Sequence, residues 1–128
     1  MDHNITDNSL GKLLEKWEEL EYLRIGNCYF LTEMSLNKIK NPEKLIALDL
    51  SGINLSSHFL INFFSKTKNL RALRIVGVKS FLEDPKVFET ILENCSQLRV
   101  LDFGNLFYFF SFLFFYFLFF YFYFFFLN

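Results

Sequence analysis

The sequence predicts an α/β solenoid in which parallel strands alternate with helical return segments. Two observations lead to this prediction. A pattern of the form L-x-x-L-x-L occurs at 20–25, 45–50, 70–75 and 98–103, so that its starts are 25, 25 and 28 residues apart. The segments between the copies space their apolar residues as amphipathic helices do. We therefore expect about four repeats within residues 1–106, followed by an aromatic tail at 107–128 of different composition.

Each copy of the pattern is expected to form a short strand, near 20–26, 45–51, 70–76 and 98–104. Successive residues of a strand face opposite sides, so Leu48 and Leu50 should point inward while Ala47, Asp49 and Ser51 point outward. One such unit cannot bury its own apolar side. Neighbouring units are therefore expected to pair their strands in parallel and to share one core.

Three connecting segments predict helices with a buried apolar stripe. The stripes are Leu10, Leu13, Leu14 and Trp17; Phe59, Leu60, Phe63 and Phe64; and Val87, Phe88, Ile91 and Leu92. The first helix is expected to begin at a cap provided by Asn8 or Ser9, and the second after Ser56. Asp84 and Pro85 suit the cap and the first position of the third helix, and the three extra residues of that segment are expected near 81–84.

The remaining connection predicts a weaker helix. Met34, Leu36 and Ile39 supply its apolar residues, and Pro42 is expected to end it early because proline cannot continue a helical hydrogen-bond ladder.

The pattern and its period resemble the leucine-rich-repeat superfamily over about residues 10–106. Cys95 precedes Leu98 by three residues, and Cys28 follows Leu20 by eight. Both spacings are similar to those of the cysteine-containing repeats in substrate receptors of cullin-RING ubiquitin ligases. The resemblance implies a protein-interaction module, a fragment of an intracellular protein that, at full length, could present substrates to such a ligase.

The chain departs from the family pattern in the turn after each strand. The consensus asparagine or cysteine is Cys28 in the first copy, but Ile53, Val78 and Leu106 occupy that position in the next three. We therefore expect no asparagine ladder, and the backbone groups of these turns need other partners.

Charges alternate at the outward position between the second and third apolar residues of the pattern, which holds Arg24, Asp49, Arg74 and Asp102. Parallel strands lie about 4.8 Å apart, so these side chains can pair across strands. One interpretation is an ion ladder that satisfies itself on a solvated face. The other is the floor of a protein-binding face. The candidate residues of that face are Tyr22, Arg24, Asp49, Ser51, Arg74, Val76 and Asp102.

Other functional classes find little support in residues 1–106. The net charge of −1 and the absence of a basic run argue against nucleic-acid binding. No catalytic motif or zinc-ligand spacing occurs, so we expect neither an enzyme nor a bound metal or cofactor. The N-terminus lacks the features of a secretory signal, which predicts a cytoplasmic protein. Trp17, Cys28 and Cys95 are expected in the core, the cysteines as free thiols.

Residues 107–127 consist of Phe, Tyr and Leu with a single Ser. As a helix they are long enough to cross a membrane, although no Lys or Arg flanks them. So many consecutive aromatic residues cannot all enter the core of a small solenoid. The composition also fits a T-rich non-coding stretch translated through an error in the gene model, the interpretation we favour. A membrane-anchored structural protein is the alternative to a soluble interaction module, and membrane contact is expected only if this tail is real.

Overall fold

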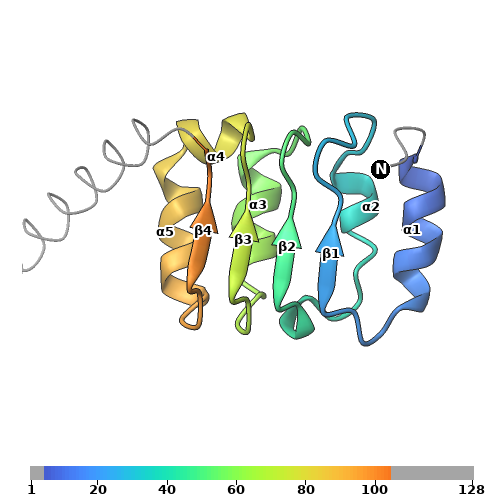
Figure 1. Ribbon diagram of the computed structural model, residues 1–128, viewed down its shortest axis with the longest axis horizontal. Coiled ribbons are helices and arrows are strands. Elements are labelled where there is room, and N and C mark those ends of the chain that lie inside the picture. Colours follow the sequence, from blue (N-terminus) through green and yellow to red (C-terminus); the bar gives the residue numbers. More distant parts are fainter. Residues whose placement is uncertain (1–4, 105–128) are drawn as a thin grey trace, which may run out of the picture.

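The computed structural model describes residues 5–104 as a sheet of four parallel strands with helices on one of its faces (Figure 1). The strands follow one another in chain order: β1 (Tyr22–Arg24), β2 (Ala47–Asp49), β3 (Ala72–Arg74) and β4 (Val100–Asp102). This arrangement confirms the expected α/β class with a parallel sheet. The tail at 107–128 lies outside the described residues.

The helices lie behind the sheet in the view of Figure 1, and α1 lies beyond β1 at one end of the row. Their bounds are α1 (Asp7–Lys16), α2 (Glu33–Leu36), α3 (Ser57–Phe64), α4 (Lys79–Glu83) and α5 (Pro85–Asn94), with a 3-10 helix η1 (Pro42–Lys44) before β2. The connection between β3 and β4, which carries the three extra residues, contains two helices, α4 and α5.

Equivalent positions of the four motif segments are paired across the sheet. Leu23 is in register with Leu48, Leu48 with Leu73, and Leu73 with Leu101. The longer connection before β4 therefore leaves the register of the sheet unchanged. A one-residue slip would turn every buried residue of a strand toward solvent, so burial of one face holds this register.

The core lies between the sheet and the helices, and the strands supply it through alternate residues. The second leucine of the motif is buried in β1, β2 and β3 and partly buried in β4. The third apolar residue is buried in all four segments, as Ile25, Leu50, Ile75 and Phe103. Burial of an aliphatic or aromatic side chain of this size contributes about 1.5–3 kcal/mol, so these positions account for much of the driving force for folding.

The first helix begins earlier than the sequence indicated. Its cap is Thr6, not Asn8 or Ser9, and Thr6 and Ser9 form a reciprocal capping box. Thr6 Oγ1 accepts a hydrogen bond from Ser9 N at 3.3 Å, and Ser9 Oγ accepts one from Thr6 N at 3.1 Å. A box of this kind satisfies two backbone donors at once, which fixes the start of α1 at Asp7.

The expected stripe of α1 is only half buried. Leu10 and Leu14 enter the core, whereas Leu13 is exposed and Trp17 retains 45% of its accessible surface. The prediction that Trp17 lies in the core is therefore wrong. Among the described elements α1 packs mainly against α2, so only the side of the helix that faces α2 is covered.

The other caps match the sequence more closely. Ser56 caps α3 by accepting a hydrogen bond from Phe59 N at 3.1 Å, and the Asp84 side chain accepts one from Lys86 N at 3.0 Å. Pro85 occupies the first turn of α5, as expected. Leu92, assigned to the buried stripe of α5, is instead exposed.

Pro42 does not end a helix. The return segment after β1 forms only one turn, α2, which stops at Leu36, and Pro42 begins the separate 3-10 helix η1. Proline suits a helix start because its missing N–H would be unpaired there in any case. Leu36 and Ile39 are buried, but Met34 is exposed.

Candidate protein-binding face

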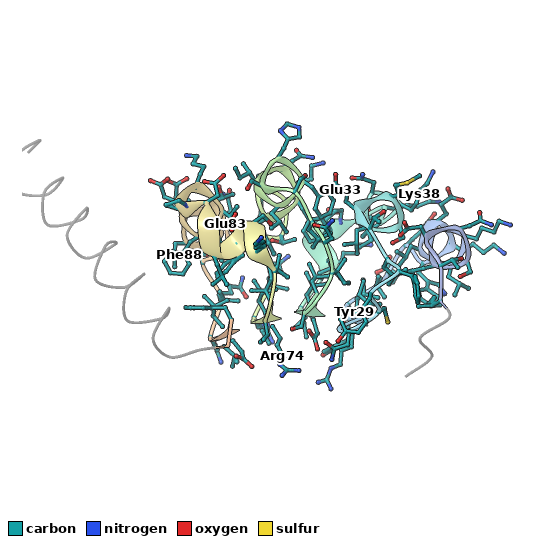
Figure 2. The ribbon with its side chains drawn as sticks, turned by 90° about the horizontal axis from the view of Figure 1, so that it is seen from above. Tyr29, Glu33, Lys38, Arg74, Glu83 and Phe88 are labelled. Atoms are coloured by element: carbon teal, nitrogen blue, oxygen red, sulfur yellow. The ribbon has the colours of Figure 1, made fainter. Side chains whose placement is uncertain are left out.

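No described element covers the outward face of the sheet. Figure 2 shows the helices on one side of the molecule and Arg74 of β3 directed away from them. The middle residues of β1, β2 and β3 are buried beneath this face, while Tyr22, Arg24, Arg74 and Val100 are exposed on it. Residues 5–104 thus present an open strand surface that carries most of the candidate residues.

Arg74 joins three strands of the expected charge ladder. Its Nη1 lies 3.7 Å from Asp49 Oδ2 on β2, and its Nε donates to Asp102 Oδ2 on β4 at 3.1 Å. Ion pairs as exposed as these contribute at most about 1 kcal/mol each. The centre of the ladder therefore satisfies itself, in line with the first of the two sequence-based interpretations.

Arg24 is the exception in this ladder. It is exposed, and among residues 5–104 it forms no ion pair, although Asp49 is its register neighbour on β2. The Asp49 carboxylate is engaged elsewhere, because Oδ1 accepts a hydrogen bond from Ser51 N at 3.0 Å and Oδ2 contacts Arg74. The guanidinium of Arg24 is left available to another carboxylate.

Two residues beside the ladder have structural roles. Ser51 was expected to face a partner, but it is buried, and its hydroxyl accepts a hydrogen bond from Val76 N at 3.0 Å. Gly26 leaves space for the Asp49 carboxylate, since a Cβ at residue 26 would lie 2.8 Å from both carboxylate oxygens. Val76 is partly exposed. The accessible part of the candidate face is therefore Tyr22, Arg24, Arg74, Val76 and Asp102.

Exposed aromatic residues that the sequence analysis did not select lie next to β1. Tyr29 and Phe30, in the turn after β1, are 68% and 71% exposed, and Met34 of α2 is also exposed. Tyr29 reaches toward the turn after β2, where a Cβ on Gly52 would meet its ring at 3.2 Å. The positions of Tyr29 and Phe30 in the sequence could have indicated their exposure. Both fall between β1 and α2, outside the alternation of the strand and the apolar spacing of the helix.

A shallow pocket of about 670 Å³ opens between the end of α1 and the start of β1, lined by residues 16–22. Trp17 and Tyr22 supply its aromatic surface. Two of its carboxylates already have partners, because Glu18 Oε1 lies 3.5 Å from Lys40 Nζ and Glu19 Oε1 lies 2.5 Å from Lys44 Nζ. Tyr22 lines the pocket and is also exposed on the strand face. The pocket and the strand face therefore form one surface at the β1 end of the sheet.

Both cysteines are buried, as predicted. Burial raises the pKa of Cys95, and a contact of 3.3 Å between its Sγ and Thr67 Oγ1 lowers it by less. Such a thiol has little thiolate at neutral pH and is a poor nucleophile.

Within residues 5–104, no three His, Cys, Asp or Glu side chains gather in a way that could hold a metal ion. In the same span, every helix is too short or too polar to cross a membrane. A comparison with models of known protein families finds no match to this chain.

Proposed function

We propose that this chain is a protein-interaction module of the leucine-rich-repeat type that binds a protein partner through the outward face of its sheet. The repeated motif supports the repeat interpretation, because its four copies occupy four adjacent strands in register. The uncovered strand face supports a binding role. The narrower assignment to ubiquitin-ligase substrate receptors, acting in the cytoplasm, rests on the spacing of Cys28 and Cys95 and stays a prediction.

The observation that carries the proposal is that exposed aromatic side chains gather at β1 around an arginine, Arg24, that has no ion-pair partner among the described residues. Tyr22 is 65% exposed on the strand, Tyr29 and Phe30 project from the following turn, and Arg24 lies between them in sequence without an ion-pair partner among the described residues. Tyrosine, tryptophan and arginine dominate binding energy in protein interfaces. The β1 end of the face is therefore the proposed centre of the interface.

The proposed partner presents a carboxylate to Arg24 and apolar groups to the neighbouring rings. The guanidinium of arginine favours a planar, bidentate contact with a carboxylate. Arg74 and Asp102 hold each other already, so they contribute orientation and long-range steering more than affinity.

Selection of a random peptide library against the full chain tests the proposal. Peptides that bind the strand face should carry Asp or Glu and should bind Arg24→Glu or Tyr22→Ala at least about tenfold more weakly, the loss expected for a central contact worth more than ~1.4 kcal/mol. The matched control is Lys66→Glu, which makes the same charge change at an exposed residue beyond α3. Because every variant retains residues 107–128, binding to the tail would be equal in all of them. Equal binding to the Arg24, Tyr22 and Lys66 variants would contradict the proposal.

A further inference from the structure

We propose that the two ends of the sheet are complementary and that a second copy of this chain docks head to tail, with β4 of one copy beside β1 of the next. The inference rests on the repeat interpretation of the proposed function. It adds a definite occupant, a second copy, to the open edge of β1.

The elements at the two ends complement each other. α1 lies at the β1 end of the row (Figure 1). Within residues 5–104, no strand pairs with the outer edge of β1, so the helix–strand unit that begins with α1 has no strand of its own on that side. β4 lies at the other end and is the last strand of the described row. A β4 strand placed beside β1 of a neighbouring copy would supply the strand that α1 of that copy lacks.

Backbone groups at both edges are oriented for such a pairing. β1 bonds to β2 through its odd-numbered residues, as when Ile25 N donates to Asp49 O at 3.0 Å. The N–H and C=O groups of Tyr22 and Arg24 alternate with these and point to the open edge. β4 uses Val100 N and Asp102 O toward β3. Its Leu101 groups therefore point to the opposite edge, where a parallel strand can bond to them.

Charge supports the same register. Arg74 is flanked by an aspartate on each neighbouring strand and contacts both. Among residues 5–104, Arg24 has an aspartate, Asp49, on one neighbouring strand, and Asp102 has an arginine, Arg74, on one neighbouring strand. Parallel docking in register places Asp102 of one copy beside Arg24 of the next, so the alternation of charge continues across the joint.

Exposed apolar residues gather at the same two ends. At the β1 end, the exposed residues are Leu13 on α1, Trp17 just after it and Tyr22 on β1. At the β4 end, they are Leu92 on α5 and Val100 on β4. In the proposed register Tyr22 lies beside Val100, an aromatic and β-branched pair of the kind that stabilises neighbouring strands. Because the contact joins different surfaces, it does not close on a dimer, and it propagates into linear oligomers.

Disulfide trapping of the full chain tests the geometry. In the variant Tyr22→Cys/Val100→Cys, the two new thiols lie about 5 Å apart across the proposed joint but about 14 Å apart within one chain, three strand spacings away. A disulfide needs Cα atoms within about 7 Å. Mild oxidation should therefore give a ladder of disulfide-linked oligomers on a non-reducing gel.

The matched control is Ala47→Cys/Val100→Cys, which moves one thiol to the interior strand β2. Residue 47 then lies two strand spacings, about 10 Å, from residue 100 both within one chain and across the proposed joint, too far for a disulfide. Random aggregation, including any caused by residues 107–128, would cross-link both variants equally. Equal ladders, or no ladder from a folded Tyr22→Cys/Val100→Cys protein, would overturn the inference.

Charge exchange supplies the second arm. Adding Arg24→Asp to the cross-linking variant should lower the yield of oligomers by about fivefold, the factor that ~1 kcal/mol gives, and adding Asp102→Arg as well should restore much of it. A yield of cross-linked oligomers that neither charge substitution changes would also overturn the inference. The peptide selection is a separate measurement: peptide binding without cross-linking would leave the proposed function in place and remove only the second copy as an occupant.

Discussion

Asp7 and Thr32, 25 residues apart, join the start of α1 to the start of α2. Thr32 N donates to Asp7 Oδ1 at 2.9 Å, and Thr32 Oγ1 donates to Asp7 Oδ2 at 2.6 Å. Thr32 is also the cap of α2, so the first residue of one helix orients the cap of the next. Glu33 repeats the arrangement, because its Oε2 accepts from Ser56 N at 3.1 Å and from Ser56 Oγ at 2.8 Å.

The Asp7 contact predicts a stability that depends on pH. Partial desolvation raises the pKa of Asp7, but hydrogen bonds from Thr32 and Ser35 outweigh it, so the pKa lies below its ordinary value. A depressed pKa stabilises the fold fully above the unfolded value near 3.8, and this stability is lost as the pH falls through the folded value. Asp7→Asn should therefore cost about 1 kcal/mol at pH 7, allowing for solvent screening.

Urea unfolding of the wild-type chain and Asp7→Asn at pH 7 and pH 3 measures this effect. The free energies of unfolding of the wild-type chain and of Asp7→Asn should differ less at pH 3 than at pH 7. Protonation of Asp7 removes the negative charge that strengthens the hydrogen bonds it accepts. Glu93→Gln, at an exposed position of α5, serves as the control. A difference that stays constant between the two pH values would show that the charge of Asp7 does not contribute to stability.

The turns after the strands satisfy their backbone without an asparagine ladder. Asn27 N donates to Ser51 O at 2.7 Å, and Gly52 N donates to Val76 O at 2.9 Å, so the sheet ladder continues into the turns. Asn27, Gly52 and Gly77 all have positive φ, between 66° and 75°. Their spacing of 25 residues was visible in the sequence, since asparagine and glycine are the residues that most readily adopt this conformation.

Gly77→Ala and Gly52→Ala should separate backbone strain from crowding. The backbone conformation alone costs an alanine about 1–2 kcal/mol. A Cβ at residue 77 meets nothing within 4 Å, whereas one at residue 52 meets Asn27 Oδ1 and Tyr29 Cε1 at 3.2 Å each. The Gly52 variant should therefore lose more stability than the Gly77 variant.

Thermal or urea unfolding of both variants measures that difference. Asn27→Gly is the control, and it should be close to neutral because glycine adopts the same conformation without strain. Equal losses for the two alanine variants would mean that Tyr29 moves away freely, and that its ring is not held against the turn after β2.

The sheet and its core followed from the sequence because they depend on local rules. Alternation within each strand selects one buried side, and the common motif brings Leu23, Leu48 and Leu73 into register. The ends of the row did not follow. A helix stripe is buried only where a neighbour covers it, and Trp17 directly follows α1, which packs mainly against α2 among the described elements. No pattern within α1 contains that information.

The candidate site shows the same limit. The alternating charges allow pairing along the whole ladder, one of the two interpretations that the sequence left open, and Arg74 does pair with both neighbouring aspartates. Arg24 does not, because Asp49 is held by Ser51 N and by Arg74. Which of two equally spaced partners a side chain selects depends on competing hydrogen bonds, and the sequence pattern does not rank these.

Buried Cys95 should react slowly with thiol reagents. Burial raises its pKa, with the Thr67 contact opposing this by less, so both access and thiolate fraction are low at neutral pH. We expect the labelling of both native cysteines to be more than about tenfold slower than in urea-unfolded protein, since even ~1.4 kcal/mol of opening free energy gives that factor. Tyr22→Cys provides an exposed thiol as the positive control. Labelling of native Cys95 as fast as that control would contradict its burial.

The fluorescence of Trp17, the single tryptophan, reports directly on the open end of the row. With 45% of its surface accessible, Trp17 should emit close to the wavelength of free tryptophan and should be quenched efficiently by acrylamide in dilute protein. Acrylamide is preferable to iodide because Glu18 and Glu19 follow Trp17 and would repel an anion. Head-to-tail docking covers this end, so quenching should fall as the protein concentration rises, and Arg24→Asp should weaken that dependence. Blue-shifted emission that resists acrylamide even at the lowest concentration would place Trp17 in the core after all.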